Sequence, residues 1–462
     1  MGTATQPAPW SASLVNTLRR PMGQHDRQRA ALHLIDWLGC AHLGQTSPTG
    51  AVLKRWAKHQ VPGPIWACGH PHGLSAGDAA RWNGSLGNCH ELDDVHRAAV
   101  VHPGDTVIPA ALAMAQREGV SAQRLLEALV IGYETGILLG LLSGPSHYAQ
   151  WYSTATTGAF ASAMACAHLR RLDPLQTQHA LALAGMQSSG VWQCRLEPGL
   201  AKQLATGHSA QAGLLAADMA AAGMTGPLAI LEGPLGWLAA TRGQRDAGQA
   251  MALLQTSADS GWRMHEVSFK PWPACRHVHP AIECALHMHL HLHAQGLNPD
   301  QIEQLQLHTY AVAITFADQP EPQTPLEGKF SLQHGVAWAL CHGSFGLEAT
   351  AQSALAEPAC SQLRTRVQLA CGPDQERAYP GQFGARLQAQ MKNGSLWTHE
   401  VASVLGDPEN PLSPAQIQSK SLGLLQGLGW SQARAQGLVS ACLQLPQGLA
   451  LKHWWKLLEQ AA

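Results

Sequence analysis

The first half of the chain repeats one pattern, an alanine-rich helix with apolar residues every three or four positions. Residues 26–43 place Ala31, Leu34, Ile35 and Leu38 on one face. Alanine favours helix and runs of β-branched residues are rare here, so local propensity agrees with the periodicity. We therefore predict a large all-helical domain. The same spacing recurs in residues 107–116, 122–142, 155–169, 174–185 and 202–222.

The pattern changes near Trp262. Residues 280–293 still suit a helix, but 301–314 and 363–369 have the alternating residue types of strands. Residues 385–401 carry Asn393-Gly394 between two alternating runs, which predicts a β-hairpin. This part of the chain is expected to be a smaller domain of mixed α+β type.

Helical spacing returns near the C-terminus, over 413–426 and 431–443, and these helices are expected to fold back onto the first domain. A length of 462 residues is enough for two or three domains. We predict a mainly α protein, in which a large helical domain (1–262, completed by 408–462) is interrupted by an inserted α+β lid domain (263–407).

Charge is scarce and balanced: 13% of residues are charged, and 30 basic against 31 acidic side chains give a net charge of −1. This balance gives no support to nucleic-acid or membrane binding. Eleven cysteines without a C-x-x-C pair, and an N-terminus without a signal-peptide pattern, favour a cytoplasmic protein. The apolar stretch 125–142 contains Glu127 and Glu134 and falls short of the ~20 apolar residues of a membrane span, so we predict a buried core helix.

A histidine-rich stretch, HMHLHLH, is the one candidate metal site. On a helix His287 and His291 share a face, as do His289 and His293. Such pairs can bind zinc or nickel, but no carboxylate or cysteine completes the set, which favours a solvated helix face. The chain has no G-x-G-x-x-G, P-loop lysine or G-x-S-x-G motif, so nucleotide-binding and α/β-hydrolase functions lose their usual support.

Five segments gather ionisable residues beside glycine or proline. Alone, each has a structural explanation, such as a solvated helix end or a turn. Together they supply carboxylates, histidines and lysines in a chain that is otherwise poor in charge, which favours placement for chemistry. The segments are 88–112, 147–160, 200–213, 269–283 and 327–340.

The amino-acid sequences of these segments and their order along the chain resemble those of the MmgE/PrpD family, over about residues 26–430. The motifs in sequence order are ELDD, HPG with PAALA, GYE, W-x-S-T-A-T-T-G, K-x-L-x-x-G-x-S-A, GP-x-x-I-L-E-G, FKP-x-P-x-CR-x-x-HPAIE, KFSL and GDPENPLS. The family includes 2-methylcitrate dehydratase, cis-aconitate decarboxylase and iminodisuccinate epimerase. The resemblance implies a helical domain interrupted by an α+β lid, a homodimer, small polycarboxylate substrates, and a site between the domains that needs no metal or other cofactor.

These reactions share one difficulty, a carbanion-like centre next to a carboxylate. A nearby ammonium stabilises the extra negative charge, and such electrostatic help is often the largest catalytic contribution. Lys202 and Lys270 suit this role and would also bind substrate carboxylates. His102 is the expected acid–base, because imidazole both takes and gives a proton near neutral pH. Asp94 and Glu91 lie in the same segment and are expected to orient His102 or to act as the base.

The segment 269–283 supplies the other expected substrate contacts. Arg276 can bind a carboxylate bidentately, with His277 as a nearby donor. Cys275 stands where some family members place a histidine after the lid lysine. Two further departures are Tyr152, where many members carry a catalytic histidine, and Val95, where many carry threonine. A phenol has a reference pKa near ~10, so Tyr152 is expected to donate a proton but to be a poor base.

The sequence therefore predicts a metal-independent lyase or isomerase, most readily of the dehydratase type, that removes a proton next to a carboxylate of a small di- or tricarboxylate. Two alternatives stay open. One is a metal-dependent hydratase or hydrolase that uses the His287–His293 helix. The other is a catalytically degenerate family member that acts as a binding protein, suggested by Tyr152, Val95 and Cys275.

Overall fold

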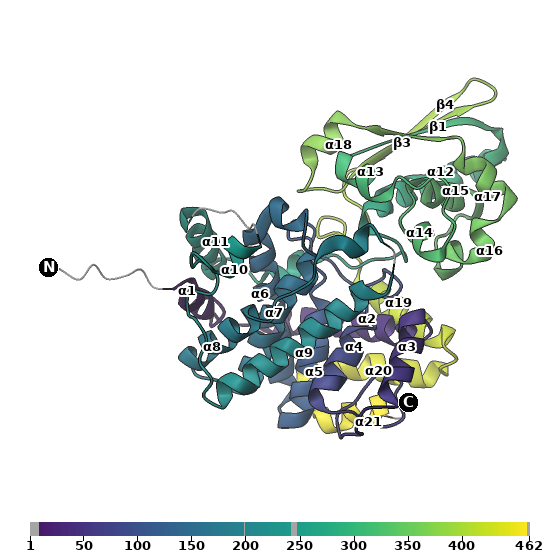
Figure 1. Cartoon of the computed structure of the whole chain (residues 1–462). Helices are drawn as coiled ribbons and strands as arrows, with labels where there is room; N and C mark the ends of the chain where they lie inside the picture. Colours follow the sequence, from purple (N-terminus) through teal and green to yellow (C-terminus); the bar gives the residue numbers. More distant parts are fainter. Residues whose placement is uncertain (1–8, 198, 242–246, 460–462) are drawn as a thin grey trace. The chain divides into compact units, whose positions relative to one another are not determined.

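The computed structural model describes residues 9–197, 199–241 and 247–459. Two compact units make up the chain: one reaches Val267 and resumes at Ser413, and the other is the continuous segment Ser268–Leu412 (Figure 1). Each unit has a hydrophobic core of its own. Helices dominate, and the described strands form a single small sheet, so the prediction of a mainly α protein is confirmed.

The described part of the first unit consists of helices joined by loops, with isolated β-bridges but no strand. Its helices are α1 Trp10–Thr17, α2 Gln24–Gly44, α3 Pro48–Ala57, α4 Ala76–Gly84, α5 Gly104–Glu118, α6 Ala122–Tyr148, α7 Ser153–Leu169, α8 Pro174–Gly185, α9 Ala201–Ala221, α10 Trp237–Ala240, α11 Ala247–Asp259, α19 Pro414–Gly427, α20 Gln432–Gln444 and α21 Leu451–Glu459. Short 3₁₀ turns lie at Trp192–Arg195, Arg263–Glu266 and Leu445–Gln447.

Local signals explain where these helices begin and how closely they pack. Asp173 and Gln176 form a capping box at the start of α8, with Pro174 in its first turn. On α9, a Cβ at Gly207 would lie 2.2 Å from the Ser85 hydroxyl oxygen, and one at Gly213 would lie 2.4 Å from the Ser162 Cβ. The small residues of α9 therefore let α4 and α7 approach closely.

Helix α6 is long and apolar enough to cross a membrane by composition alone, with a mean hydropathy of 1.7 over its most apolar window. However, 89% of that window is buried inside the protein. Glu134 lies within it and forms an ion pair with Arg20 at 3.0 Å. The prediction of a buried core helix is confirmed.

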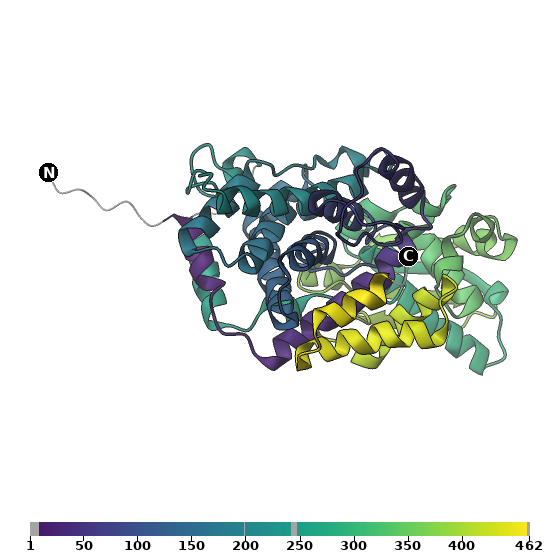
Figure 2. The ribbon, with the colours of Figure 1, turned by 90° about the horizontal axis from the view of Figure 1, so that it is seen from below.

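The C-terminal helices lie beside α2, although almost 400 residues of sequence separate them (Figure 2). The Ser421 hydroxyl on α19 donates to the Ile35 carbonyl at 3.0 Å, and the Lys420 ammonium lies 2.7 Å from the Asp36 carboxylate. Trp454 on α21 is fully buried in the same core. The first unit is thus assembled from both ends of the chain.

The second unit places helices against a four-stranded mixed sheet of order β2-β1-β3-β4, in which β1 pairs parallel with β2 and antiparallel with β3. Helix α12 packs on β3 and β4 and contacts α15. The strands are β1 Ile302–Thr309, β2 Val367–Cys371, β3 Ala385–Met391 and β4 Leu396–Val401. The helices are α12 His279–Ala294, α13 Ala311–Ala317, α14 Pro325–Lys329, α15 Leu332–His342, α16 Gln352–Leu355, α17 Pro358–Arg364 and α18 Pro373–Ala378, with 3₁₀ turns at Arg276–Val278, Pro299–Gln301 and Leu347–Thr350.

Two strand predictions need correction, whereas the hairpin at 385–401 is confirmed as β3 and β4. The strand expected over 301–314 ends at Thr309, and α13 follows because the Glu376 carboxylate accepts the Ala311 backbone N–H at 2.7 Å, at the start of that helix. The strand expected over 363–369 begins only at Val367, because α17 continues through Arg364.

Candidate active site

The segment from Asn88 to His102 carries most of the predicted catalytic residues of the first unit. It contains a short bridge between His96 and Val101 and leads directly into α5. Glu91 and Val100 adopt left-handed backbone conformations, with φ of 55° and 50°. Such conformations cost non-glycine residues free energy and often occur at functional sites.

His102 is held at the start of α5 by three contacts. Its backbone N–H donates to the Thr154 hydroxyl at 3.0 Å, and its ring Nδ1 lies 2.9 Å from the Asp94 carbonyl oxygen. The same Nδ1 lies 2.6 Å from Asp93 Oδ2. Both oxygens favour a proton on Nδ1, so a neutral ring carries its lone pair on Nε2. This is the tautomer that a general base needs.

The Asp94 carboxylate is occupied in a buried network rather than facing the His102 ring. It lies 2.7 Å from His33 Nδ1, accepts the Tyr133 hydroxyl at 2.7 Å and accepts the Gly104 N–H at 3.1 Å. Arg29 Nε lies 3.1 Å from His33 Nε2. Burial lowers the pKa of His33 to about 4, so the ring is neutral at pH 7. Asp94 therefore reaches His102 through its backbone carbonyl, and its side chain fixes the turn into α5.

A second carboxyl group, from Asp105, is fully buried beside Asp93. Burial, together with the negative charges of Asp93 and Asp94, raises the pKa of Asp105 well above the usual value for a carboxyl group. The protonated acid is therefore favoured, and in that form it can donate a hydrogen bond to Asp93. Asp93 thus stands between a neutral acid and the His102 ring.

Lys202, in the first turn of α9, forms an ion pair with Glu91. Burial alone would lower the pKa of Lys202, but the negative charges of Glu91 and Asp93 outweigh burial and hold the pKa well above its usual value. The side chain therefore remains an ammonium. Because its charge acts on Asp93, which contacts His102, the lysine belongs to the same electrostatic cluster.

Tyr152 lies directly before α7 and is almost completely buried. Its ring stacks on Trp192 with a centroid separation of 4.7 Å, and Lys202 Nζ lies 5.8 Å from its ring centroid. Asn88 Nδ2 donates to the Tyr152 hydroxyl at 3.5 Å. Burial raises the pKa of Tyr152, which keeps it a phenol and thus a proton donor.

In the second unit, Arg276 is engaged in ion pairing. Its guanidinium forms a buried ion pair with Asp407, and Nη1 lies 3.0 Å from His279 Nδ1. The Ser268 hydroxyl donates to the same Asp407 oxygen at 2.7 Å. The charge of Arg276 is therefore balanced within its own unit.

The other predicted residues of the second unit are also buried. The His277 ring stacks on Phe383 at 5.1 Å, and its Nδ1 lies 2.7 Å from the Tyr310 hydroxyl. The Cys275 N–H donates to the Lys329 carbonyl at 2.9 Å, and Lys270 is fully buried. Aromatic packing thus fixes His277, and backbone pairing fixes Cys275.

The sequence predicted the segment from Asn88 to His102 and the charged side chains Glu91 and Lys202. It missed three residues of the cluster around His102. Asp93 was visible within the ELDD motif, one position before the aspartate that was chosen. No sequence motif marks His33 or Asp105 as a site residue. His33 lies inside the regular helix α2, and Asp105 lies in the first turn of α5, where an acidic residue is common in any helix.

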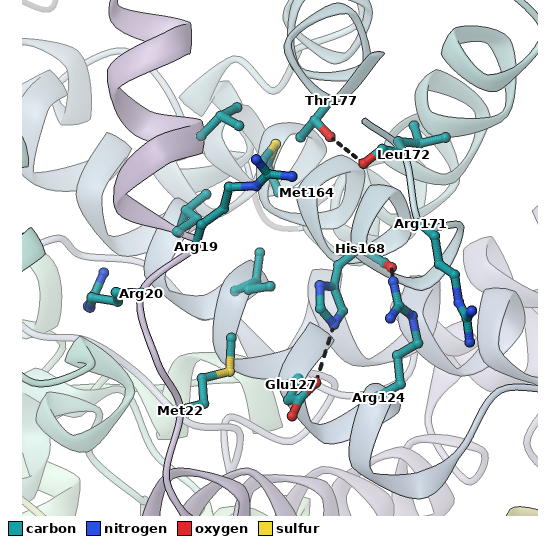
Figure 3. Close-up of a pocket in the computed structure, with 13 residues that line it drawn as sticks. Arg19, Arg20, Met22, Arg124, Glu127, Met164, His168, Arg171, Leu172 and Thr177 are labelled. Carbon is teal, nitrogen blue, oxygen red and sulfur yellow. Dashed lines mark hydrogen bonds and ion pairs between the residues drawn. The ribbon is translucent and has the colours of Figure 1, made fainter. Parts of the chain in front are cut away.

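A separate cavity of about 540 Å³ lies in the first unit between the end of α1 and helices α6, α7 and α8 (Figure 3). Its lining is basic, because four arginines and one glutamate contribute to it. Arg124 donates to the His168 carbonyl, and His168 Nε2 lies 3.6 Å from Glu127. None of the predicted site residues lines it. The lining residues are Val15, Leu18, Arg19, Arg20, Met22, Arg124, Glu127, Ile131, Met164, His168, Arg171, Leu172 and Thr177.

Comparison with known proteins identifies the family of the chain. The model of the MmgE/PrpD N-terminal domain matches residues 14–250, and that of the C-terminal domain matches residues 272–445. The chain belongs to the MmgE/PrpD family. Among curated proteins it is similar to a cis-aconitate decarboxylase-like protein of Aspergillus oryzae, with 26% identity over 85% of each chain. It is also similar to a cis-aconitate decarboxylase of Aspergillus terreus, with 24% identity over 85% of this chain and 84% of the relative.

Possible metal ligands of this MmgE/PrpD protein converge at two places within residues 9–197, 199–241 and 247–459. One group is His25, Asp26 and His265, and the other is His342, Glu357 and Cys360. The histidine-rich run on α12 belongs to neither. There His287 stacks on His399 at 4.3 Å, and His289 Nδ1 lies 2.7 Å from the Leu340 carbonyl oxygen.

Proposed function

We propose that the protein is a lyase of the dehydratase or decarboxylase type that acts on a small di- or tricarboxylate, with His102 as its acid–base. The observation that carries the proposal is the contact of His102 Nδ1 with both Asp93 and the Asp94 carbonyl, in a cluster that also holds the Lys202 ammonium. Family membership and the decarboxylase names of the relatives support a lyase.

In the proposed reaction, His102 Nε2 takes the proton from the carbon next to a substrate carboxylate. The electron pair left on that carbon spreads into the carboxylate, where the Lys202 ammonium offsets the added charge. The pair then expels hydroxide from the neighbouring carbon, which leaves as water with a proton from Tyr152. In a decarboxylation, loss of carbon dioxide supplies the electron pair, and protonated His102 returns a proton to the carbon.

The Lys202–Glu91 ion pair has a consequence for substrate binding. A carboxylate that approaches Lys202 competes with Glu91 for the same ammonium. Binding therefore requires a substrate with enough negative charge to share or displace that contact. This requirement favours di- and tricarboxylates over monocarboxylates.

Solvent exchange tests the shared first step without knowledge of the product. The protein is incubated in deuterated water with citrate, methylcitrate, cis-aconitate or iminodisuccinate, and deuterium at the carbon next to the carboxylate is followed by NMR. We expect His102→Ala to slow exchange by about 10²-fold or more, since a positioned base contributes ~10²–10⁴. Lys202→Met removes the ammonium that offsets the added charge and is expected to abolish exchange.

His59→Ala and Lys58→Ala are the matched controls, because both side chains are exposed at the end of α3. They should leave exchange unchanged. Product analysis in the same tubes separates loss of water, loss of carbon dioxide and epimerisation. Substrate binding without any exchange would instead support the degenerate binding protein suggested by Tyr152 and Val95.

A further inference from the structure

Two helices of the second unit bring three metal-ligand side chains together, with a fourth, Cys341, beside one of them, far from the His102 cluster in sequence. Cys341 and His342 end α15, whereas Glu357 precedes α17 and Cys360 lies within it. The ligand atoms of His342, Glu357 and Cys360 all lie within 4.8 Å of one another. The Cys341 and Cys360 thiols share a hydrogen bond. The spacing, Cys-His followed by Glu-x-x-Cys, draws two ligands from each helix.

Packing holds these side chains in place before any ion binds. The His342 ring stacks on Trp338 at 4.0 Å, and its Nε2 lies 3.0 Å from the Glu357 carboxylate. Cys360 is completely buried. Preorganisation of this kind lowers the free-energy cost of ordering ligands around a cation.

Arg364 is the positively charged neighbour of Cys360. The Arg364 guanidinium itself is held by the His334 ring at 3.1 Å and the Leu355 carbonyl at 2.9 Å, so it need not turn toward the ligands.

We propose that Cys341, His342, Glu357 and Cys360 form a structural site for zinc that joins α15 to α17. Two sulfur, one nitrogen and one oxygen ligand make the closed, four-coordinate set typical of structural zinc. On binding, each thiol loses its proton to solvent, and the ion replaces the proton shared by His342 and Glu357. The site belongs to the second unit alone and takes no part in the proposed reaction.

The other candidate group, His25, Asp26 and His265, provides an internal comparison. It has no thiol, and His25 is exposed. His25 and His265 stack face to face at 4.4 Å with an interplanar angle of 3°. A metal bound there would lack sulfur ligands, so spectroscopy can tell the two groups apart.

Cobalt substitution tests the proposal on the full-length, tag-free protein, reduced and stripped of metal. Cobalt(II) should bind with the near-ultraviolet charge-transfer band of a thiolate ligand, and zinc should displace it. Cys341→Ser and Cys360→Ser should each weaken the band and the binding of zinc, and the double variant, which has no thiolate left, should abolish the band and weaken zinc binding by more than about 100-fold. Cys371→Ser, at an exposed cysteine of the same unit, and His265→Ala should leave both unchanged.

His342→Ala keeps the test decisive if Cys360→Ser fails to fold, because His342 is partly exposed. It should retain a shifted band with weaker zinc affinity. The proposal is overturned if no thiolate band appears, if the band keeps its full intensity in Cys341→Ser, or if it survives in the double variant. A Cys341–Cys360 disulfide found by peptide mapping of protein purified without reductant, together with no metal uptake after reduction, would overturn it as well.

Discussion

The charged cluster around His102 in the first unit and the one around Arg276 in the second unit are built on opposite plans. Around His102, four carboxyl groups gather near Lys202 and Arg29, and Asp105 favours the protonated form. Around Arg276, one guanidinium is matched to one carboxylate, Asp407. The first cluster contains groups that can exchange protons, whereas in the second the charge of Arg276 is neutralised by that of Asp407. The comparison teaches that a buried charge in a family motif can serve either chemistry or the fold.

The sharpest way to break this comparison is to remove Arg276. Arg276→Met leaves the Asp407 charge buried without its partner, so we expect a loss of about 3–5 kcal/mol in the free energy of unfolding. Urea denaturation measures it, and Arg377→Ala, in an exposed ion pair, should have no measurable effect. A normal stability with a raised KM would show instead that Arg276 binds substrate.

The pH dependence of stability should show the burial of His33 in the first unit. His33 has a pKa of about 4 when folded and an ordinary value near 6.5 when unfolded. The unfolded chain therefore binds the proton first, and about 3 kcal/mol of stability, complete above pH 6.5, is lost as the pH falls toward 4. His33→Gln should reduce the slope of unfolding free energy against pH by one proton between these limits, whereas His59→Gln should not.

Asp93 tests whether its carboxylate supports the base. Asp93→Asn keeps the shape but can present its amide N–H₂ to His102 Nδ1, which favours the wrong tautomer. We expect turnover to fall by about 10²-fold with little change in stability. Steady-state kinetics and urea denaturation on the same preparation separate the two effects. An unchanged kcat would remove Asp93 from the proposed mechanism.

Tyr152 tests the proton donor of the proposed loss of water. Tyr152→Phe retains the stacking on Trp192 and removes the hydroxyl that would protonate the leaving hydroxide. Because a positioned acid contributes ~10²–10⁴, we expect kcat for loss of water to fall by about 10²-fold. Tyr152→His restores the residue that many family members carry. A gain in turnover for this variant would show that the phenol is a poorer acid–base in the same place.

Periodicity predicted the helices well because they are stabilised locally: α8 spans 174–185, as its Asp173 cap and apolar spacing require. The strand prediction over 301–314 failed after Thr309 because Glu376, from a distant helix, holds the first turn of α13. In the candidate site, the sequence named His102 and Lys202 but could not assign Asp93 over Asp94. Glu91, in the segment that orients Asp93 and Asp94, has a left-handed backbone conformation. No local propensity predicts that conformation for a glutamate.

The division of the first unit between both ends of the chain has a consequence during synthesis. Its core includes Leu438, Trp454 and Leu458, which are synthesised after the whole of the second unit. The second unit, a continuous segment, is complete before them. A chain that ends at Leu412 thus carries the complete second unit after first-unit helices whose apolar surface is still exposed to chaperones and proteases.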